Sequence, residues 1–140
     1  MVTFREFVTN LKSRLRENEH WRPQMDFLVY EHYDDYFCLE AFSEAVATLQ
    51  QRIGLAIHDA RNLTKHGTDQ FVRLDCDELF ADRPAHEIAT LKRTGRIPRA
   101  AQLYDSSLVA EVRRMYRGDI AFYTKTINRP LTFPPAERAP

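Results

Sequence analysis

The sequence of 140 residues predicts an α/β fold that is mainly helical, with one or two short strands. Two observations indicate this class. Several segments repeat apolar residues every three or four positions, and the few short apolar runs without that spacing are bounded by polar residues. The length suits one domain, which we expect over residues 1–128. The prolines among residues 129–140 predict a disordered tail.

Charge and hydropathy exclude several classes of function. Lys and Arg together number 20, as do Asp and Glu, so the formal charge is zero and we expect no nucleic-acid partner. No apolar run is long enough for a transmembrane helix and no signal-peptide pattern opens the chain, so we expect no membrane segment and a cytoplasmic location. Cys38 and Cys76 lie far apart and no compact His or Cys spacing occurs, so we expect reduced thiols and no metal.

The first half of the chain contains two predicted helices. Thr3 and Glu6 form a capping box ahead of an apolar stripe, which predicts a helix that ends near Asn18. Residues 36–39 (Tyr-Phe-Cys-Leu) predict a buried strand, which would need partner strands for its backbone groups. Ser43 is then a candidate N-cap for a second helix, which Gly54 would end.

The second half begins with a loop over residues 58–69 and a brief strand over residues 71–74. Pro84 suits the first turn of a helix that covers residues 85–93 and that Gly95 ends. A break follows at residues 96–98. The last helix starts at Asp105 or Ser106 and extends past residue 120, weakened locally by a glycine at position 118.

Residues 20–24 (His-Trp-Arg-Pro-Gln) form the densest cluster of chemically versatile side chains. An imidazole can act as a general base near neutral pH, and a guanidinium can bind sulfate, phosphate or carboxylate oxygens in a fork. An indole face suits sugar rings. The structural alternative is a loop after a helix, with Trp21 in the core and Arg22 in solvent.

Two further clusters are weaker. Residues 62–66 (Asn-Leu-Thr-Lys-His) could hold a phosphate through side chains and free amides, or could be a solvated loop. Asp75 and Asp77 could bind a divalent metal and the diphosphate of a nucleotide sugar, as in a glycosyltransferase remnant, or could simply be solvated.

The order of these pieces resembles the carboxy-terminal portion of the sulfotransferase family 2 proteins, which are the carbohydrate sulfotransferases and their bacterial relatives. Residues 4–8 are similar to the family's F-x-x-F-V helix, and residues 20–24 to its H-[WF]-x-P-Q element. The other similar stretches are a strand ending in glutamate at 36–40, an Asn-x-Ser/Thr stretch at 62–64 and a final Y-x-x-D-x-x-x-[FY] helix at 116–123.

The resemblance implies a P-loop-NTPase-like α/β fold. It also implies transfer of a sulfuryl group from 3′-phosphoadenosine-5′-phosphosulfate to a hydroxyl, usually on a carbohydrate. At the matched positions, Trp21, Arg22 and Gln24 become candidates for binding the acceptor. His20 is the one residue that we would name as the general base.

The same resemblance assigns the donor side and the supporting acids. Asn62, Thr64 and Lys65 become candidates for contacts near the 3′-phosphate of the donor. Glu40 and Asp119 are expected to tie elements together as buried acids with hydrogen-bond partners.

Two of the family's donor-binding elements have no counterpart in this sequence. No basic strand–loop–helix precedes the first helix, and no Arg-Asp-Pro occurs, since residues 82–84 read Asp-Arg-Pro. We therefore expect an α/β fragment that lacks the donor-binding loop and needs a missing amino-terminal half or a homodimer partner. The alternative is a non-catalytic helical module, derived from the family, that serves interaction or dimerisation.

Overall fold

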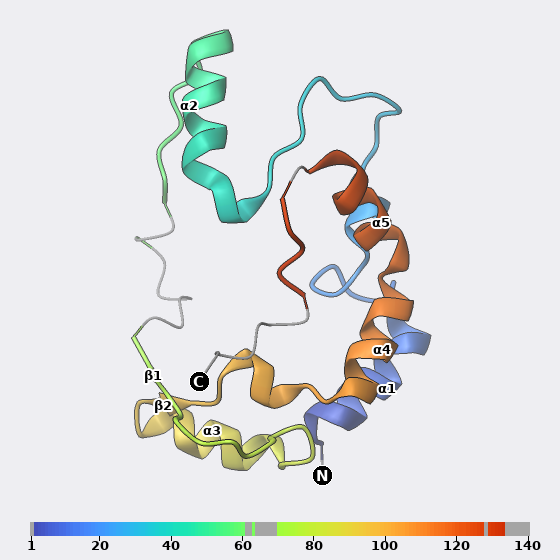
Figure 1. Cartoon of the computed structure of the whole chain (residues 1–140), viewed down its shortest axis with the longest axis vertical. Coiled ribbons are helices and arrows are strands. Elements are labelled where there is room, and N and C mark those ends of the chain that lie inside the picture. Colours follow the sequence, from blue (N-terminus) through green and yellow to red (C-terminus); the bar gives the residue numbers. More distant parts are fainter. Residues whose placement is uncertain (1, 61–62, 64–69, 128, 134–140) are drawn as a thin grey trace.

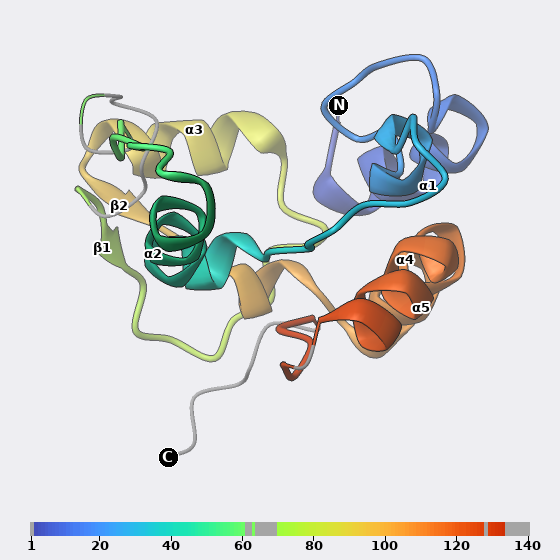
Figure 2. The same cartoon turned by 90° about the horizontal axis from the view of Figure 1, so that it is seen from above.

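The computed structural model describes residues 2–60, 63, 70–127 and 129–133. Three helices lie together: α1 (Phe4–Arg14), α4 (Ser106–Met115) and α5 (Arg117–Thr126). The helix α2 (Phe42–Ile53) stands apart from them, and α3 (Ala85–Arg93) lies beside the strands β1 (Val72–Arg73) and β2 (Arg96–Ile97) (Figures 1 and 2). Three 3₁₀ turns complete the described elements: η1 (Gln24–Phe27), η2 (Leu39–Ala41) and η4 (Ala100–Leu103). The predicted fold, mainly helical with short strands, is confirmed.

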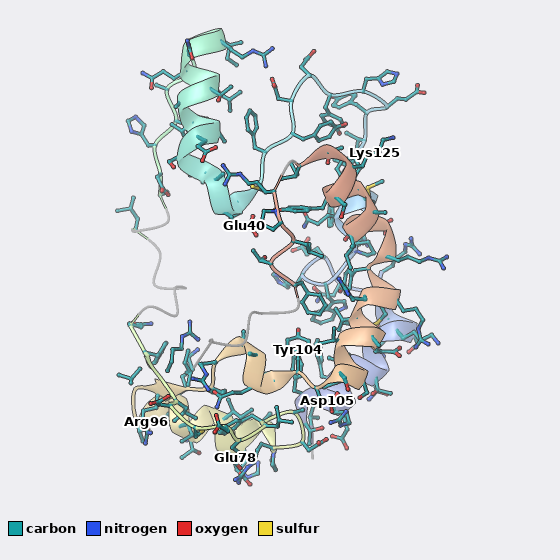
Figure 3. The ribbon with its side chains drawn as sticks, in the orientation of Figure 1. Glu40, Glu78, Arg96, Tyr104, Asp105 and Lys125 are labelled. Carbon is teal, nitrogen blue, oxygen red and sulfur yellow. The ribbon has the colours of Figure 1, made fainter. Side chains whose placement is uncertain are left out.

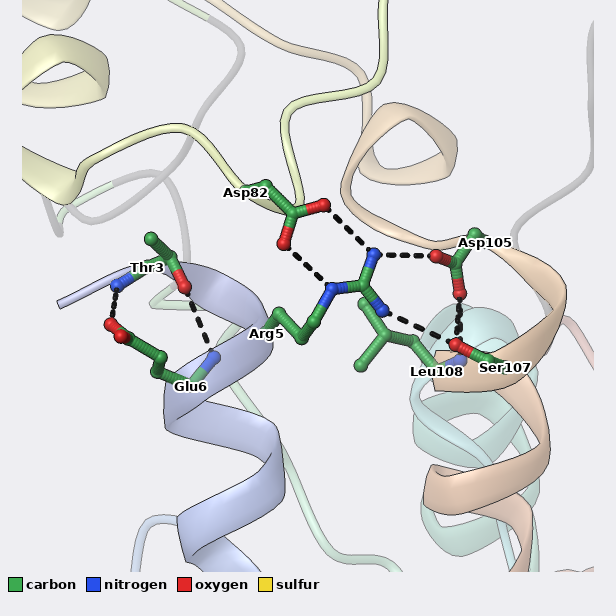
Figure 4. Close-up of polar contacts among 7 residues, drawn as sticks. All are labelled: Thr3, Arg5, Glu6, Asp82, Asp105, Ser107 and Leu108. Carbon is green, nitrogen blue, oxygen red and sulfur yellow. Dashed lines mark hydrogen bonds and ion pairs between the residues drawn. The ribbon is translucent and has the colours of Figure 1, made fainter.

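Helix α1 begins as predicted and ends earlier than predicted. The capping box is formed: the Glu6 amide donates to Thr3 Oγ1 at 3.1 Å, and the Thr3 amide donates to Glu6 Oε2 at 2.9 Å (Figure 4). The helix ends at Arg14 rather than near Asn18. The carbonyls that a longer helix would use are taken by the following loop, because the indole of Trp21 donates to the Arg14 carbonyl at 3.2 Å.

The apolar core lies between α1 and α4. Val8, Ala81 and Leu108 are its most buried members, with exposed fractions of 2%, 1% and 3%. The rings of Phe4 and Tyr104 close one side with an edge-to-face contact, their centroids 5.1 Å apart. This packing sets the position of α4, and through it the position of α5.

An ion-pair cluster around Arg5 joins the two helices to the intervening turn (Figure 4). The Arg5 guanidinium binds both carboxylate oxygens of Asp82, at 2.6 and 2.9 Å, and one oxygen of Asp105 at 2.6 Å. Asp105 also caps α4 by accepting from the Leu108 amide at 2.9 Å. Hydrogen bonds from Arg5, then from Leu108 and from Ser107, hold the pKa of Asp105 well below its usual range.

The strands β1 and β2 pair in parallel, with Val72 opposite Arg96 and Arg73 opposite Ile97. The predicted strand at residues 71–74 is confirmed, whereas the stretch expected only as a break contributes β2. Helix α3 has the predicted bounds, with Pro84 as its N-cap. Gly95 adopts φ 80°, which returns the chain from α3 into β2.

The strand expected at residues 36–39 is wrong. These residues run without regular structure into η2, and Phe37 and Leu39 are 43% and 69% exposed. The described strands lie elsewhere in the fold, so this stretch has no ladder to join. Instead the Tyr36 ring packs edge-to-face on Phe122 of α5, with centroids 5.1 Å apart. Helix α2 follows with Ala41, not Ser43, as its N-cap.

The long final helix is interrupted. Tyr116, with φ −102° and ψ 24°, separates α4 from α5, so the weakness that we placed at position 118 lies two residues earlier as a break. Beyond α5, Arg129 pairs with Glu44 of α2, and the Phe133 ring meets Tyr104 at 5.4 Å. Residues 134–140 of the predicted tail lie outside the described residues. In the described part of the chain, no helix has the length and apolar character needed to cross a membrane.

Candidate functional site

The start of α5 fixes the loop at residues 20–24. The Tyr116 hydroxyl donates to the Trp21 carbonyl at 2.5 Å. Both oxygens of Asp119 accept backbone hydrogens of η1, from Gln24 at 2.8 Å and from Met25 at 3.0 Å. Asp119 therefore ties two elements together as expected, although it is half-buried rather than buried.

The side chains of this loop divide between packing and solvent. Trp21 is half-buried against Phe7, with ring centroids 5.6 Å apart. Arg22 is also half-buried: it lies over the Phe27 ring at 5.8 Å and donates to the Arg16 carbonyl at 2.9 Å. Trp21 and Arg22 thus support the loop.

The other predicted residues have different surroundings. The side chains of His20 and Gln24 are exposed. Gln24 lines a cavity between η1 and α5, and Trp21 lines a separate cavity of about 230 Å³ beside α1. Asn62, Thr64 and Lys65 lie outside the described residues, so their predicted donor contacts stay a prediction.

A cavity of about 370 Å³ lies between η1, residues 36–40 and α5. Its size is in the range of small-molecule sites, which is roughly 300–1,000 Å³. The polar residues on its wall come from three separate stretches: Gln24, Cys38, Glu40, Asp119 and Tyr123. The larger part of its wall is apolar and aromatic and includes Met25, Leu28, Tyr36, Ile120, Phe122 and Leu131.

A small polar cluster lies at one end of this cavity. Cys38, Glu40 and Tyr123 all line the cavity, and both the Cys38 sulfur and the Glu40 carboxylate act electrostatically on the Tyr123 hydroxyl. Burial, followed by the Cys38 sulfur and the Glu40 carboxylate, raises the pKa of Tyr123. The phenol is therefore protonated at neutral pH and can serve both as a donor and as an acceptor.

Glu40 is exposed, so the prediction that it is a buried acid is wrong. It lies in η2, just before α2 (Figure 3), and Thr132 Oγ1 donates to its carboxylate at a long 3.5 Å. A carboxylate held this loosely remains able to accept a proton or a hydrogen bond from a bound molecule.

Sequence reasoning missed Cys38 and Tyr123 as members of the site. The available signal was helical spacing. Asp119 and Tyr123 are four residues apart, which places them on one face of α5, and Asp119 was already expected to meet another element. Cys38 had no comparable signal, because the stretch around it was expected to be a strand.

A second cavity, of about 390 Å³, lies beside α3. Its charged groups neutralise one another, because Arg83 pairs with both Glu78 and Glu87. Nearby, Asp75 is almost fully exposed, at 3.6 Å from Arg99. Within the described ranges, no group of three or more His, Cys, Asp or Glu side chains could hold a metal ion. No observation in this region supports the glycosyltransferase alternative.

Comparison of the chain with protein-family models, with curated proteins and with solved structures finds no match. The function of the chain is therefore inferred from its motifs and from where the fold places them.

Proposed function

We propose that this chain is sulfotransferase-like, and that the 370 Å³ cavity binds the hydroxyl-bearing acceptor, a carbohydrate-type molecule. One observation carries the proposal. Three of the stretches that resemble the sulfotransferase family, at residues 20–24, 36–40 and 116–123, meet around this single cavity. These stretches lie far apart in the sequence, so their meeting indicates either a shared core or a shared function. They surround a cavity, which favours a shared function.

The reaction would be sulfuryl transfer. The acceptor oxygen bonds to the sulfur of 3′-phosphoadenosine-5′-phosphosulfate while the bond from sulfur to the phosphate oxygen breaks. The hydroxyl proton passes to a base, and 3′-phosphoadenosine-5′-phosphate leaves. Glu40, which lines the cavity, is better placed than His20 to take that proton. Tyr123 would position the acceptor oxygen.

The donor's phosphosulfate would be held by polypeptide beyond the residues that form this cavity. The sequence carries neither the basic strand–loop–helix nor the Arg-Asp-Pro element that the resemblance would require for it. The proposal for this chain is therefore an acceptor-binding part, with transfer dependent on a donor-binding part.

A non-catalytic interaction module is the second candidate, and the sheet favours it. Among the described residues the sheet has two parallel strands, and Val72 of β1 is 67% exposed. Parallel strands are usually covered on both faces within larger sheets, and open edges invite further pairing. A partner strand at this edge would suit a protein that acts by association.

Calorimetric titration separates the two candidates. With neutral glycosides as probes, we expect millimolar or tighter binding that Tyr123→Phe weakens several-fold and that His20→Ala, at an exposed site outside the cavity, leaves unchanged. A parallel titration with 3′-phosphoadenosine-5′-phosphate reports whether the donor site is also present. Failure of every hydroxyl ligand to bind, together with a concentration-dependent dimer on sedimentation, would favour the interaction module.

A further inference from the structure

The wall of the cavity is mostly unable to hydrogen-bond. The edge-to-face pair of Tyr36 and Phe122 forms one side, and Leu28, Ile120 and Leu131 add aliphatic surface. A free oligosaccharide carries hydroxyls around each ring, so many of them would lie against these side chains and lose water without gaining a partner. The apolar wall instead suits hydrocarbon.

The apolar surface continues to the rim of the cavity. Met25, Phe37 and Leu39 line it and are 40%, 43% and 69% exposed. Beyond η1, Val29 and Tyr30 are 78% and 71% exposed. When a ligand covers exposed apolar residues beside a cavity, the free energy of the system falls, so such residues mark a candidate binding surface.

The charges around the polar end favour a neutral ligand. Glu40 is acidic, and both oxygens of Asp119 are already used by the η1 amides. Arg129 interacts electrostatically with Tyr123, but its guanidinium donates to both carboxylate oxygens of Glu44, at 2.6 and 2.5 Å. An anionic acceptor would therefore meet a carboxylate, and the Arg129 guanidinium is already paired with Glu44.

We propose that the acceptor is a neutral amphiphile, with a sugar or alcohol head and a hydrocarbon tail. Its hydroxyl would lie at Cys38, Glu40 and Tyr123, and its tail would cover Phe37 and Leu39. This inference rests on the proposed function, because it names the class of acceptor for the same cavity.

Titration of the full chain with alkyl β-glucosides, kept below their micelle concentrations, tests the inference. From methyl through butyl and hexyl to octyl glucoside, each methylene that enters the cleft should tighten binding by up to about fourfold. We expect octyl glucoside to bind at least thirtyfold more tightly than methyl glucoside, and octyl glucuronide, its anionic counterpart, to bind more weakly than octyl glucoside.

Two matched variants locate the tail. Leu39→Ala should remove much of the gain from tail length, whereas Leu79→Ala should not, because Leu79 is similarly apolar and 53% exposed but does not line the cavity. Equal octyl glucoside affinity in wild type and Leu39→Ala would overturn the placement of the tail. An affinity that does not change with tail length, combined with binding of a soluble oligosaccharide, would overturn the inference and leave the proposed function standing.

Two other outcomes have different meanings. If no glycoside of any kind binds, the proposed function itself fails. If sedimentation shows a dimer that Leu39→Ala dissociates and octyl glucoside does not, a second copy covers the apolar rim, and the amphiphile inference is overturned.

Discussion

The α1–α4 body and the region of α2 are held together in different ways. In the body, Val8 and Leu108 are almost completely buried between the two helices. Helix α2 fully buries only one apolar residue, Ala45, and its links to the rest of the described chain include surface ion pairs, Arg52 with Asp35 and Arg129 with Glu44. Exposed ion pairs contribute little to stability, whereas buried apolar side chains contribute much.

We expect α2 to open more readily than the α1–α4 body. Stability is not uniform within a fold, and segments with few buried apolar contacts open first. The candidate cavity lies between the two regions. η1 and α5 adjoin the well-packed α1–α4 body, whereas residues 36–40 lead directly into α2. A ligand in the cavity would therefore hold residues 36–40 against η1 and α5.

The largest effect is expected from a truncation in the core. Leu108→Ala should reduce the free energy of unfolding by about 2 to 5 kcal/mol, because the side chain is 3% exposed and its removal leaves a cavity. Leu39→Ala, next to α2, should stay within about 0.5 kcal/mol. Urea unfolding followed by circular dichroism measures both. Similar losses for the two variants would remove the contrast between the regions.

The next effect concerns the join between α5 and η1. Asp119→Ala should cost about 2 kcal/mol, because the amides of Gln24 and Met25 lose their acceptor together. Asp119→Asn keeps one acceptor oxygen and should cost less. The same urea assay, with tryptophan fluorescence of Trp21 as the probe, reports the loop directly. Equal stability of wild type and Asp119→Ala would contradict the assignment of the loop at residues 20–24 to the well-packed α1–α4 body.

Local signals in the sequence predicted the parts of the fold that local physics decides. The capping box of Thr3 and Glu6, the N-terminal Pro84 and the C-terminal Gly54 each act within one turn of their own helix, so the beginning of α1, the bounds of α3 and the end of α2 could be found. The early end of α1 depends on donors from Trp21 and its neighbour, which no helical pattern contains.

The site was harder to predict because it depends on contacts between distant segments. The motif at residues 20–24 suggested chemistry for Trp21 and Arg22, whereas in the structure the Trp21 indole and one guanidinium nitrogen of Arg22 donate to carbonyls at and just beyond the end of α1. A helix end leaves carbonyls without partners, and this rule could have suggested that role. Nothing in the sequence could show that residues 36–40 would face Tyr123 rather than pair as a strand.

A smaller effect is expected from a matched pair of glycines. Gly54 ends α2 with φ 67° and Gly95 ends α3 with φ 80°, and an added Cβ meets no atom within 4 Å at either position. Alanine at each site therefore adds mainly backbone strain, about 1 kcal/mol. Gly95→Ala should lower the global free energy of unfolding by that amount. Gly54→Ala should instead speed hydrogen exchange in α2 while global unfolding changes little. An equal global loss for both variants would show that α2 unfolds with the body.

The smallest effect is the pH dependence of the ion-pair cluster around Arg5, because partly exposed pairs are screened by water and salt. Arg5 holds the folded pKa of Asp105 well below the ordinary value of 3.8, and it lowers the pKa of Asp82 in the same direction. A depressed folded pKa contributes stability that is present above pH 4 and that is lost as the pH falls through the folded value. Asp105→Asn, which retains an acceptor for the α4 cap, should be less stable than wild type at pH 6.

Below pH 4 the difference between wild type and Asp105→Asn should shrink progressively, because the unfolded wild type takes up a proton at Asp105 that the folded state binds only at a much lower pH. Urea titrations at half-unit steps from pH 2 to pH 7 would measure this convergence, and 1 M salt should reduce the gap at pH 6 by screening. Parallel curves would mean that the carboxylate of Asp105 acts only as a helix cap. The ion pair with Arg5 would then contribute nothing to the stability of the α1–α4 body, which would depend on apolar packing and the helix cap.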